Sequence, residues 1–151
     1  MAIDATRDRR RFVAGGLLLG VGLGGFVDGI VLHQILQWHH LLTSEGGHPD
    51  TTVAGLEANT LADGLFHAAT WLATLAGVVL IWTSGQRAPL RQLLGLALAG
   101  WGAFNLVEGL VDHQLLGLHH VKEGDDELVF DLGFLALGAA LLVGGTALAR
   151  R

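Results

Sequence analysis

The chain has 151 residues and a formal net charge of −5, and its composition excludes an ordinary soluble domain: hydrophobic residues make up 51% and charged residues only 15%, against roughly 25% charged in typical globular proteins. Mean hydropathy is +0.50, and the 23 glycines are a content that transmembrane helices tolerate better than soluble ones. The absence of cysteine excludes disulfides and thiolate metal sites, and the few basic residues exclude a nucleic-acid-binding face.

Four segments are long and apolar enough for transmembrane helices, which need roughly 20 residues each. In chain order they cover about residues 12–42, 60–82, 93–120 and 128–149. The first carries Asp28 inside the apolar stretch, and the third carries Glu108 and Asp112. The sequence therefore predicts an all-α fold over residues 1–151, a single domain that forms an integral membrane four-helix bundle.

Basic residues lie on one side of these four segments. Eight of the nine Lys and Arg residues flank the first segment, join the second to the third or end the chain: Arg7, Arg9, Arg10, Arg11, Arg87, Arg91, Arg150 and Arg151. Since cytoplasmic flanks of membrane helices collect Lys and Arg, this pattern predicts that both termini are cytoplasmic. The acidic 43–59 and 121–127 loops then lie outside.

Small residues form ridges on the first segment. Gly16, Gly20 and Gly24 are spaced by four residues, and Gly25 and Gly29 continue on a neighbouring stripe. Such ridges let helix backbones approach closely in lipid. The ridges fit contacts within the bundle and contacts between protomers of a homo-oligomer equally well.

The chain contains an internal repeat. Residues 26–41 (FVDGIVLHQILQWHHL) match residues 106–121 (LVEGLVDHQLLGLHHV) at an offset of 80, with eight of sixteen positions identical. The pattern predicts two helical hairpins in the same orientation, about 12–82 and about 93–149, related by a pseudo-two-fold axis along the membrane normal. A weaker match pairs Asp63 with Asp131 in the second helix of each hairpin.

The histidines and acids inside the segments predict a functional site, because an ionisable group in a bilayer costs at least about 2–3 kcal/mol. At a rise of about 1.5 Å per residue, His33, His67 and His113 share one level, about 13 Å below the outer surface. These three are the expected core ligands of a metal ion. Asp63 and Asp131 are expected as further ligands or as partners that orient the imidazoles.

The helical period extends this candidate set. At about 100° per residue, four pairs of side chains share a face: His33 with His40, His113 with His120, Asp28 with His39, and Glu108 with His119. In a continuous helix His39 and His40 do not both face inward. One residue of each His-His pair is therefore expected at the membrane interface or as a partner of another ligand.

Imidazole and carboxylate ligands without sulfur suit copper(II), zinc, iron or manganese better than copper(I). The sequence thus predicts a metal-binding membrane protein whose site lies in the outer half of the bundle. Metal delivery, storage and oxygen chemistry all fit this pattern, so enzymatic activity stays undecided.

Two alternatives use the same residues. In the first, His33 and His113 are axial ligands of a b-type haem that transfers electrons, and Gly29 and Gly109 make room for the porphyrin. In the second, the intramembrane acids and the histidines form an ion or proton pathway.

The motifs of the repeat resemble those of an uncharacterised family of four-helix bacterial membrane proteins, known only as a domain of unknown function. The motifs are Gly25-Phe26-Val27-Asp28-Gly29, His33-Gln34, His39-His40, Asp63-Gly64, Glu108-Gly109, His113-Gln114 and His119-His120. The resemblance covers nearly the whole chain and implies the four-helix fold and a bacterial plasma (inner) membrane location. Genes of the family neighbour those of copper-handling cytochrome oxidase assembly factors, so the resemblance points to copper and to such partners, but it implies no established activity.

Overall fold

The computed structural model describes residues 2–44 and 46–150, which form four long helical rods and no strand. The elements are α1 (Ala2–Val27) continued by the π-helix η1 (Asp28–Ile35), α2 (Val53–Ser84), α3 (Leu90–Glu108) continued by the π-helix η2 (Gly109–Leu115), and α4 (Glu127–Arg150). All four rods are long and apolar enough to cross a membrane, which confirms the predicted all-α architecture. Glu45 of the acidic 43–59 loop and the basic Arg151 lie outside the described residues.

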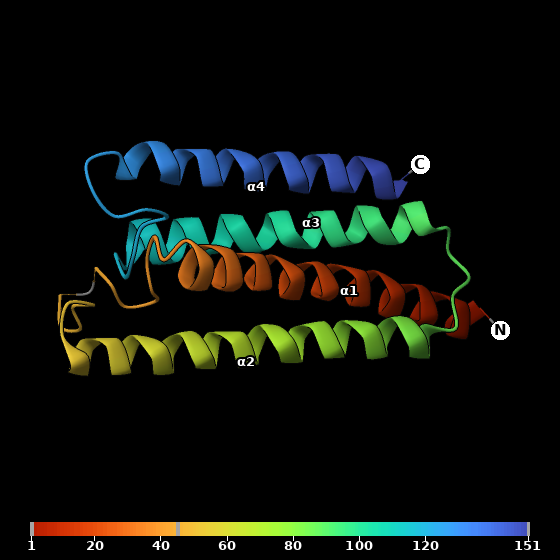
Figure 1. Ribbon diagram of the computed structural model, residues 1–151. Helices are drawn as coiled ribbons and strands as arrows, with labels where there is room; N and C mark the ends of the chain where they lie inside the picture. Colours follow the sequence, from red (N-terminus) through yellow and green to blue (C-terminus); the bar gives the residue numbers. More distant parts are fainter. Residues whose placement is uncertain (1, 45, 151) are drawn as a thin grey trace.

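The helices lie side by side in the order α2, α1, α3, α4 (Figure 1). In the described part of the chain α2 packs along α1 and α4 packs along α3, while α1 and α3 form the central pair. The central helices run in the same direction, and both chain termini lie at one end of the molecule. We call the opposite end, where α1 connects to α2 and α3 to α4, the distal end.

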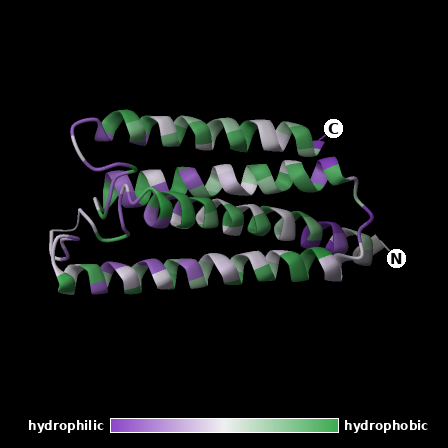
Figure 2. Cartoon of the chain, viewed as in Figure 1, coloured by the Kyte–Doolittle hydropathy of each residue, from purple (hydrophilic) through white to green (hydrophobic). Residues whose placement is uncertain are grey.

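The interior of the molecule is polar rather than apolar. Among the described residues the buried apolar side chains are only Phe12, Leu96, Ala99 and Val121, whereas large apolar side chains are exposed along all four helices. Figure 2 shows hydrophobic residues along the middle of the helices and hydrophilic ones at the N-terminal end of α1 and in the distal connections. This distribution suits a bilayer, which solvates the apolar surface.

Glycine brings the central helices close together. A Cβ atom on Gly20 would overlap the carbonyl oxygen of Ala97, and one on Gly100 would overlap that of Leu17. Gly16 of the same ridge lies against the side chain of Leu96. The ridge predicted from the sequence is therefore used inside the molecule, between α1 and α3.

The first and third helices end earlier than predicted. Both finish in a π-helix with matching backbone hydrogen bonds, from Leu36 N–H to Val31 O and from Leu116 N–H to Val111 O, each 2.8 Å. The next residue is left-handed in both cases, Gln37 with φ of 51° and Gly117 with φ of 58°. This conformation reverses the chain direction, so the expected helices to residues 42 and 120 are wrong at these ends.

We call residues 36–44 and 116–126 the return segments. They do not continue the helices outward but lie against the interior of the helix bundle. Ser44 N–H donates to Leu118 O at 2.9 Å, and the Ser44 hydroxyl donates to the Glu123 carboxylate. The two return segments are thus joined to each other as well as to their own helices.

The α1–α3 contact predicts a large effect of Gly100→Leu on stability. Because the new side chain meets backbone atoms of Leu17, it cannot be accommodated by a rotamer change, and we expect a loss of at least about 3 kcal/mol. The measurement is thermal unfolding in detergent followed by circular dichroism. Gly64→Leu is the control, because no described atom lies within 4 Å of a Cβ placed there. Equal melting temperatures of the two variants would contradict the predicted contact.

Candidate metal centre

Four buried imidazoles gather at the distal end, on the η1 and η2 turns and the return segments. The rings of His39 and His119 are stacked, with centroids 4.5 Å apart and planes 9° from parallel. His33 lies edge-on to His39 at 4.5 Å, and His113 lies edge-on to His119 at 4.8 Å. All four side chains are at least 97% buried. We call this group the four-histidine cluster.

The two stacked histidines are each held by the opposite return segment. His39 Nδ1 lies 2.8 Å from Val121 O, and His119 Nδ1 lies 3.2 Å from Leu41 O. A carbonyl oxygen only accepts, so Nδ1 carries the proton in both rings and Nε2 keeps its lone pair. Burial and the neighbouring His119 lower the pKa of His39 to about 3, and burial also lowers the pKa of His119. Both rings are therefore neutral at pH 7.

Asp63 of α2 anchors the first return segment. Its carboxylate accepts hydrogen bonds from His33 Nδ1 at 2.9 Å, from His40 Nδ1 at 2.7 Å and from the backbone N–H of Leu41 at 3.0 Å. The carboxylate itself is almost fully buried. One side chain thus orients a ring of the cluster and holds the non-helical backbone in place.

Asp131 of α4 makes the matching contacts in the second half. Its Oδ2 accepts from His120 Nδ1 at 2.7 Å and its Oδ1 accepts from Val121 N–H at 3.0 Å. His113 Nδ1 lies 3.2 Å from the same Oδ1. Burial opposes a charge on His120, but the hydrogen bond and charge of Asp131 raise its pKa overall. The Gln114 amide also donates to Asp131, at 3.0 Å.

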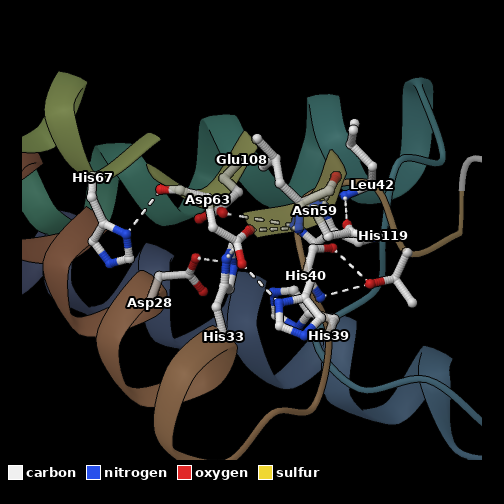
Figure 3. A network of polar contacts seen from close by, with 12 residues as sticks. Asp28, His33, His39, His40, Leu42, Asn59, Asp63, His67, Glu108 and His119 are labelled. Atoms are coloured by element: carbon white, nitrogen blue, oxygen red, sulfur yellow. Dashed lines mark hydrogen bonds and ion pairs between the residues drawn. The ribbon is translucent and has the colours of Figure 1, made fainter. Parts of the chain in front are cut away.

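Two further acids approach the cluster from the helices. Asp28 Oδ2 lies 3.1 Å from His33 Nε2, without the alignment of a hydrogen bond, and Glu108 Oε1 lies 3.8 Å from His119 Nε2. Neither carboxylate oxygen of Glu108 has a hydrogen-bond partner in the described structure. Figure 3 shows Asp28, His33, His39 and Glu108 converging on one region.

The geometry forms two overlapping groups suited to a metal ion. In each group, one nitrogen or oxygen atom of every residue lies within 4.8 Å of the others. The groups are His33, His39 and His119, and Glu108, His113 and His119. Within the described residues, Nε2 of all four cluster histidines lacks a hydrogen-bond partner. His119 belongs to both groups.

The structure brings together most, but not all, of the residues expected from the sequence. Among the described residues, His67 belongs to neither ligand group. Its Nδ1 donates to the carbonyl oxygen of Asp63 at 2.9 Å (Figure 3), and its Nε2 faces Gly29. The physical reason is that α2 packs along α1 and not along α3. His67 therefore stays on the far side of α1 from the second half of the cluster.

One residue of each His-His pair acts as a partner of another ligand, as expected. His39 enters the cluster, whereas His40 bonds to Asp63, the carboxylate that also accepts from His33. The expectation assumed a continuous helix, whereas the helix ends at Ile35. Once the chain reverses, the 100° rule no longer applies to the next residues.

Sequence reasoning missed Asn59 of α2. Its side-chain oxygen accepts from Leu42 N–H at 3.0 Å, and its amide nitrogen donates to His48 O at 2.8 Å. Asn59 therefore fixes two points of the connection between α1 and α2. Asn59 fell in the predicted 43–59 loop, because α2 begins at Val53 and not at residue 60, so nothing in the sequence indicated that this amide is buried. The carbonyls of Leu41 and Val121 carried no signal in the sequence.

Comparison with known proteins gives a family. Residues 15–151 match the model of a family described as "Predicted membrane protein (DUF2243)". The chain belongs to this family. The match confirms the resemblance found in the sequence motifs and supports a location in a membrane, and the function of the family is unknown. No curated protein and no solved structure matches the chain.

The anchoring role of Asp63 predicts that Asp63→Asn destabilises the distal end. The amide is the same size but offers one acceptor oxygen where three donors converge, and each buried donor left unpaired costs about 1–3 kcal/mol. We expect a lower melting temperature in thermal unfolding of the purified protein. Asp50→Asn, at an exposed loop position, is the control; a shift of the same size there would refute the anchoring role.

Proposed function

We propose that this protein binds transition-metal ions inside the membrane, with His33, His39, His113 and His119 as nitrogen ligands and Glu108 and Asp28 as carboxylate ligands. The observation that carries the proposal is that four buried imidazoles, whose Nε2 atoms lack hydrogen-bond partners among the described residues, form two overlapping ligand groups together with Glu108. Metal-binding histidines typically direct the other ring nitrogen to an oxygen acceptor, which sets the tautomer. The Nδ1 atoms of His33, His39 and His119 follow that pattern, and His113 Nδ1 lies 3.2 Å from Asp131 without a hydrogen bond.

Energetics support a bound cation. Buried polar groups that lack partners cost free energy, and the cost is higher still in a bilayer, where water does not compensate. His119 Nε2 lies 3.8 Å from Glu108 Oε1, and the Nε2 lone pairs of the cluster and both Glu108 oxygens lack hydrogen-bond partners among the described residues. A divalent metal ion would satisfy these lone pairs at once and offset the negative charge.

The ligand types suit copper(II), zinc and iron(II). We propose copper as the first ion to test, in line with a role near respiratory oxidase assembly factors. Because the two ligand groups share His119, they fit either one ion or a pair of ions.

The ring arrangement favours metal ions over the haem alternative. A porphyrin bound by His33 and His113 would lie between these two residues. The stacked rings of His39 and His119 occupy that space, with centroids within 4.8 Å of the proposed axial ligands. The closed glycine contact between Gly20 and Ala97 further along the central pair likewise favours binding over an ion or proton pathway.

We further propose that both termini are cytoplasmic in the bacterial inner membrane, so the distal end faces outward. His40 and His120 then lie at the outer side, where their side chains are 19% and 25% exposed. They are partly exposed imidazoles that bind the same carboxylates that the cluster histidines His33 and His113 contact.

The matched contacts of the two halves support the proposed pseudo-two-fold repeat. Asp63 accepts from His40 and Asp131 from His120, and each also accepts from a backbone amide of its return segment. Each carboxylate also contacts a cluster histidine, His33 through a hydrogen bond and His113 at 3.2 Å. A repeat of this kind would place a metal site close to the pseudo-symmetry axis, at the edges of the stacked His39 and His119 rings.

Elemental analysis of the purified protein tests the proposal. We expect stoichiometric copper, zinc or iron in the wild type, and an affinity at least about tenfold weaker in His119→Asn, because this residue belongs to both groups. Asparagine keeps an amide donor close to the position of Nδ1, so the bond to Leu41 O is preserved.

His67→Asn is the matched control, because His67 is another histidine near the cluster whose ring lies outside both ligand groups. Its metal content should equal that of the wild type. The proposal fails if the wild type holds no more metal than His119→Asn, or if the purified protein shows the Soret absorption band of haem.

A further inference from the structure

A cavity of about 340 Å³ lies beside the four-histidine cluster, between α1, α3 and α4. Its size is at the lower end of the usual range for small-molecule sites, roughly 300–1,000 Å³. The rim includes Val27 on α1 and Leu137 on α4, which are 40% and 50% exposed. Both lie within the spans, so the opening faces the hydrocarbon of the bilayer.

Aromatic side chains form much of the wall. Trp38 and Phe130 meet edge to face with ring centroids 5.3 Å apart, and Trp101 and Phe134 line the cavity as well. Lys122 lies over the Trp38 and Phe130 rings, 5.7 and 4.9 Å from their centroids. A flat aromatic ligand suits such walls.

Two buried polar side chains interrupt this apolar lining. Asp28 and Asn105 both line the cavity and are 3% and 2% exposed. Asn105 Oδ1 has no hydrogen-bond partner within the described chain, and Asp28 Oδ2 has only its unaligned contact with His33. An unsatisfied buried acceptor costs about 1–3 kcal/mol. A ligand that donates hydrogen bonds to these two oxygens would remove this cost.

Helix packing explains the position of Asn105 but not its amide oxygen, because its Cβ lies against Gly138 of α4 whereas Oδ1 has no hydrogen-bond partner within the described chain. In the first half of the repeat the corresponding position, 80 residues earlier, is Gly25, which packs closely against Thr70. The second half therefore carries an amide where the first half carries no side chain. The cavity lies on the side of that amide.

We propose that this cavity binds a quinol, an aromatic ring with hydroxyl groups and an alkyl tail. The hydroxyls donate to Asp28 and Asn105, the ring packs among the aromatic walls, and the tail leaves past Val27 and Leu137 into the bilayer. Binding depends only on the cavity; that the quinol lies beside a metal ion, through Asp28, rests on the proposed function.

Gly133 of α4 offers a direct test. It lines the cavity, and no described atom lies within 4 Å of a Cβ placed on it, so Gly133→Leu fills the cavity without displacing the protein. Gly144→Leu is the matched control, because Gly144 is on the same helix, is equally open and is not part of the cavity lining.

The experiment titrates 2-decyl-1,4-benzoquinol into purified protein in detergent, with calorimetry and tryptophan fluorescence as readouts, and repeats the titration with decylbenzene. We expect the wild type and Gly144→Leu to bind the quinol at least about tenfold more tightly than decylbenzene. A tenfold difference in affinity corresponds to the free energy of about one good hydrogen bond. Gly133→Leu should lose quinol binding, and Asn105→Ala should lose the preference for the quinol.

Unchanged quinol binding in Gly133→Leu would overturn the proposal, and so would equal binding of decylbenzene by the wild type, which would indicate a site for lipid tails. Each titration is run on metal-stripped protein and on protein loaded with copper. Metal content is measured separately and should be the same in Gly133→Leu and wild type. Failure of the metal site and failure of the quinol site are therefore distinguishable.

Discussion

The distal end depends on two buried carboxylates, each of which accepts hydrogen bonds from imidazole and from backbone. Non-helical backbone at membrane depth is tolerated only where protein satisfies its polar groups, and Asp63 and Asp131 do this for the amides of Leu41 and Val121. Because these bonds hold the return segments inside the molecule, the chain can leave the helix early. The histidines on those segments are then directed toward the centre rather than toward the surface.

The close approach of α1 and α3 is the second requirement. Glycine contacts such as Gly20 with Ala97 bring the two parallel helices together, and their return segments consequently meet. Each segment then supplies the carbonyl that orients the stacked histidine of the other, Val121 O for His39 and Leu41 O for His119. The cluster therefore needs both halves of the chain, and neither hairpin forms it alone.

Much of this arrangement was predictable from residue types. Acids and histidines inside apolar segments are costly, so Asp28, Glu108 and His33 stood out without a structure, and the repeat indicated which residues would play matching parts. The prediction failed where it extended the first and third helices to residues 42 and 120, because the chain leaves helical geometry at Gln37 and Gly117. It also placed His67 with the core ligands, because depth along a helix can be counted from the sequence but the neighbours of that helix cannot.

The sequence by itself determined the four apolar helices, the common side of the termini and the residues that carry the polar chemistry, because hydropathy, charge and repetition are properties of the chain read in order. Only the tertiary structure decided that α2 and α4 flank a central pair, that the chain reverses at Gln37 and Gly117, and that His39 and His119 stack at the centre. The reason is physical: helix order and chain reversal depend on contacts between residues about 80 positions apart, and such contacts arise only when the helices pack.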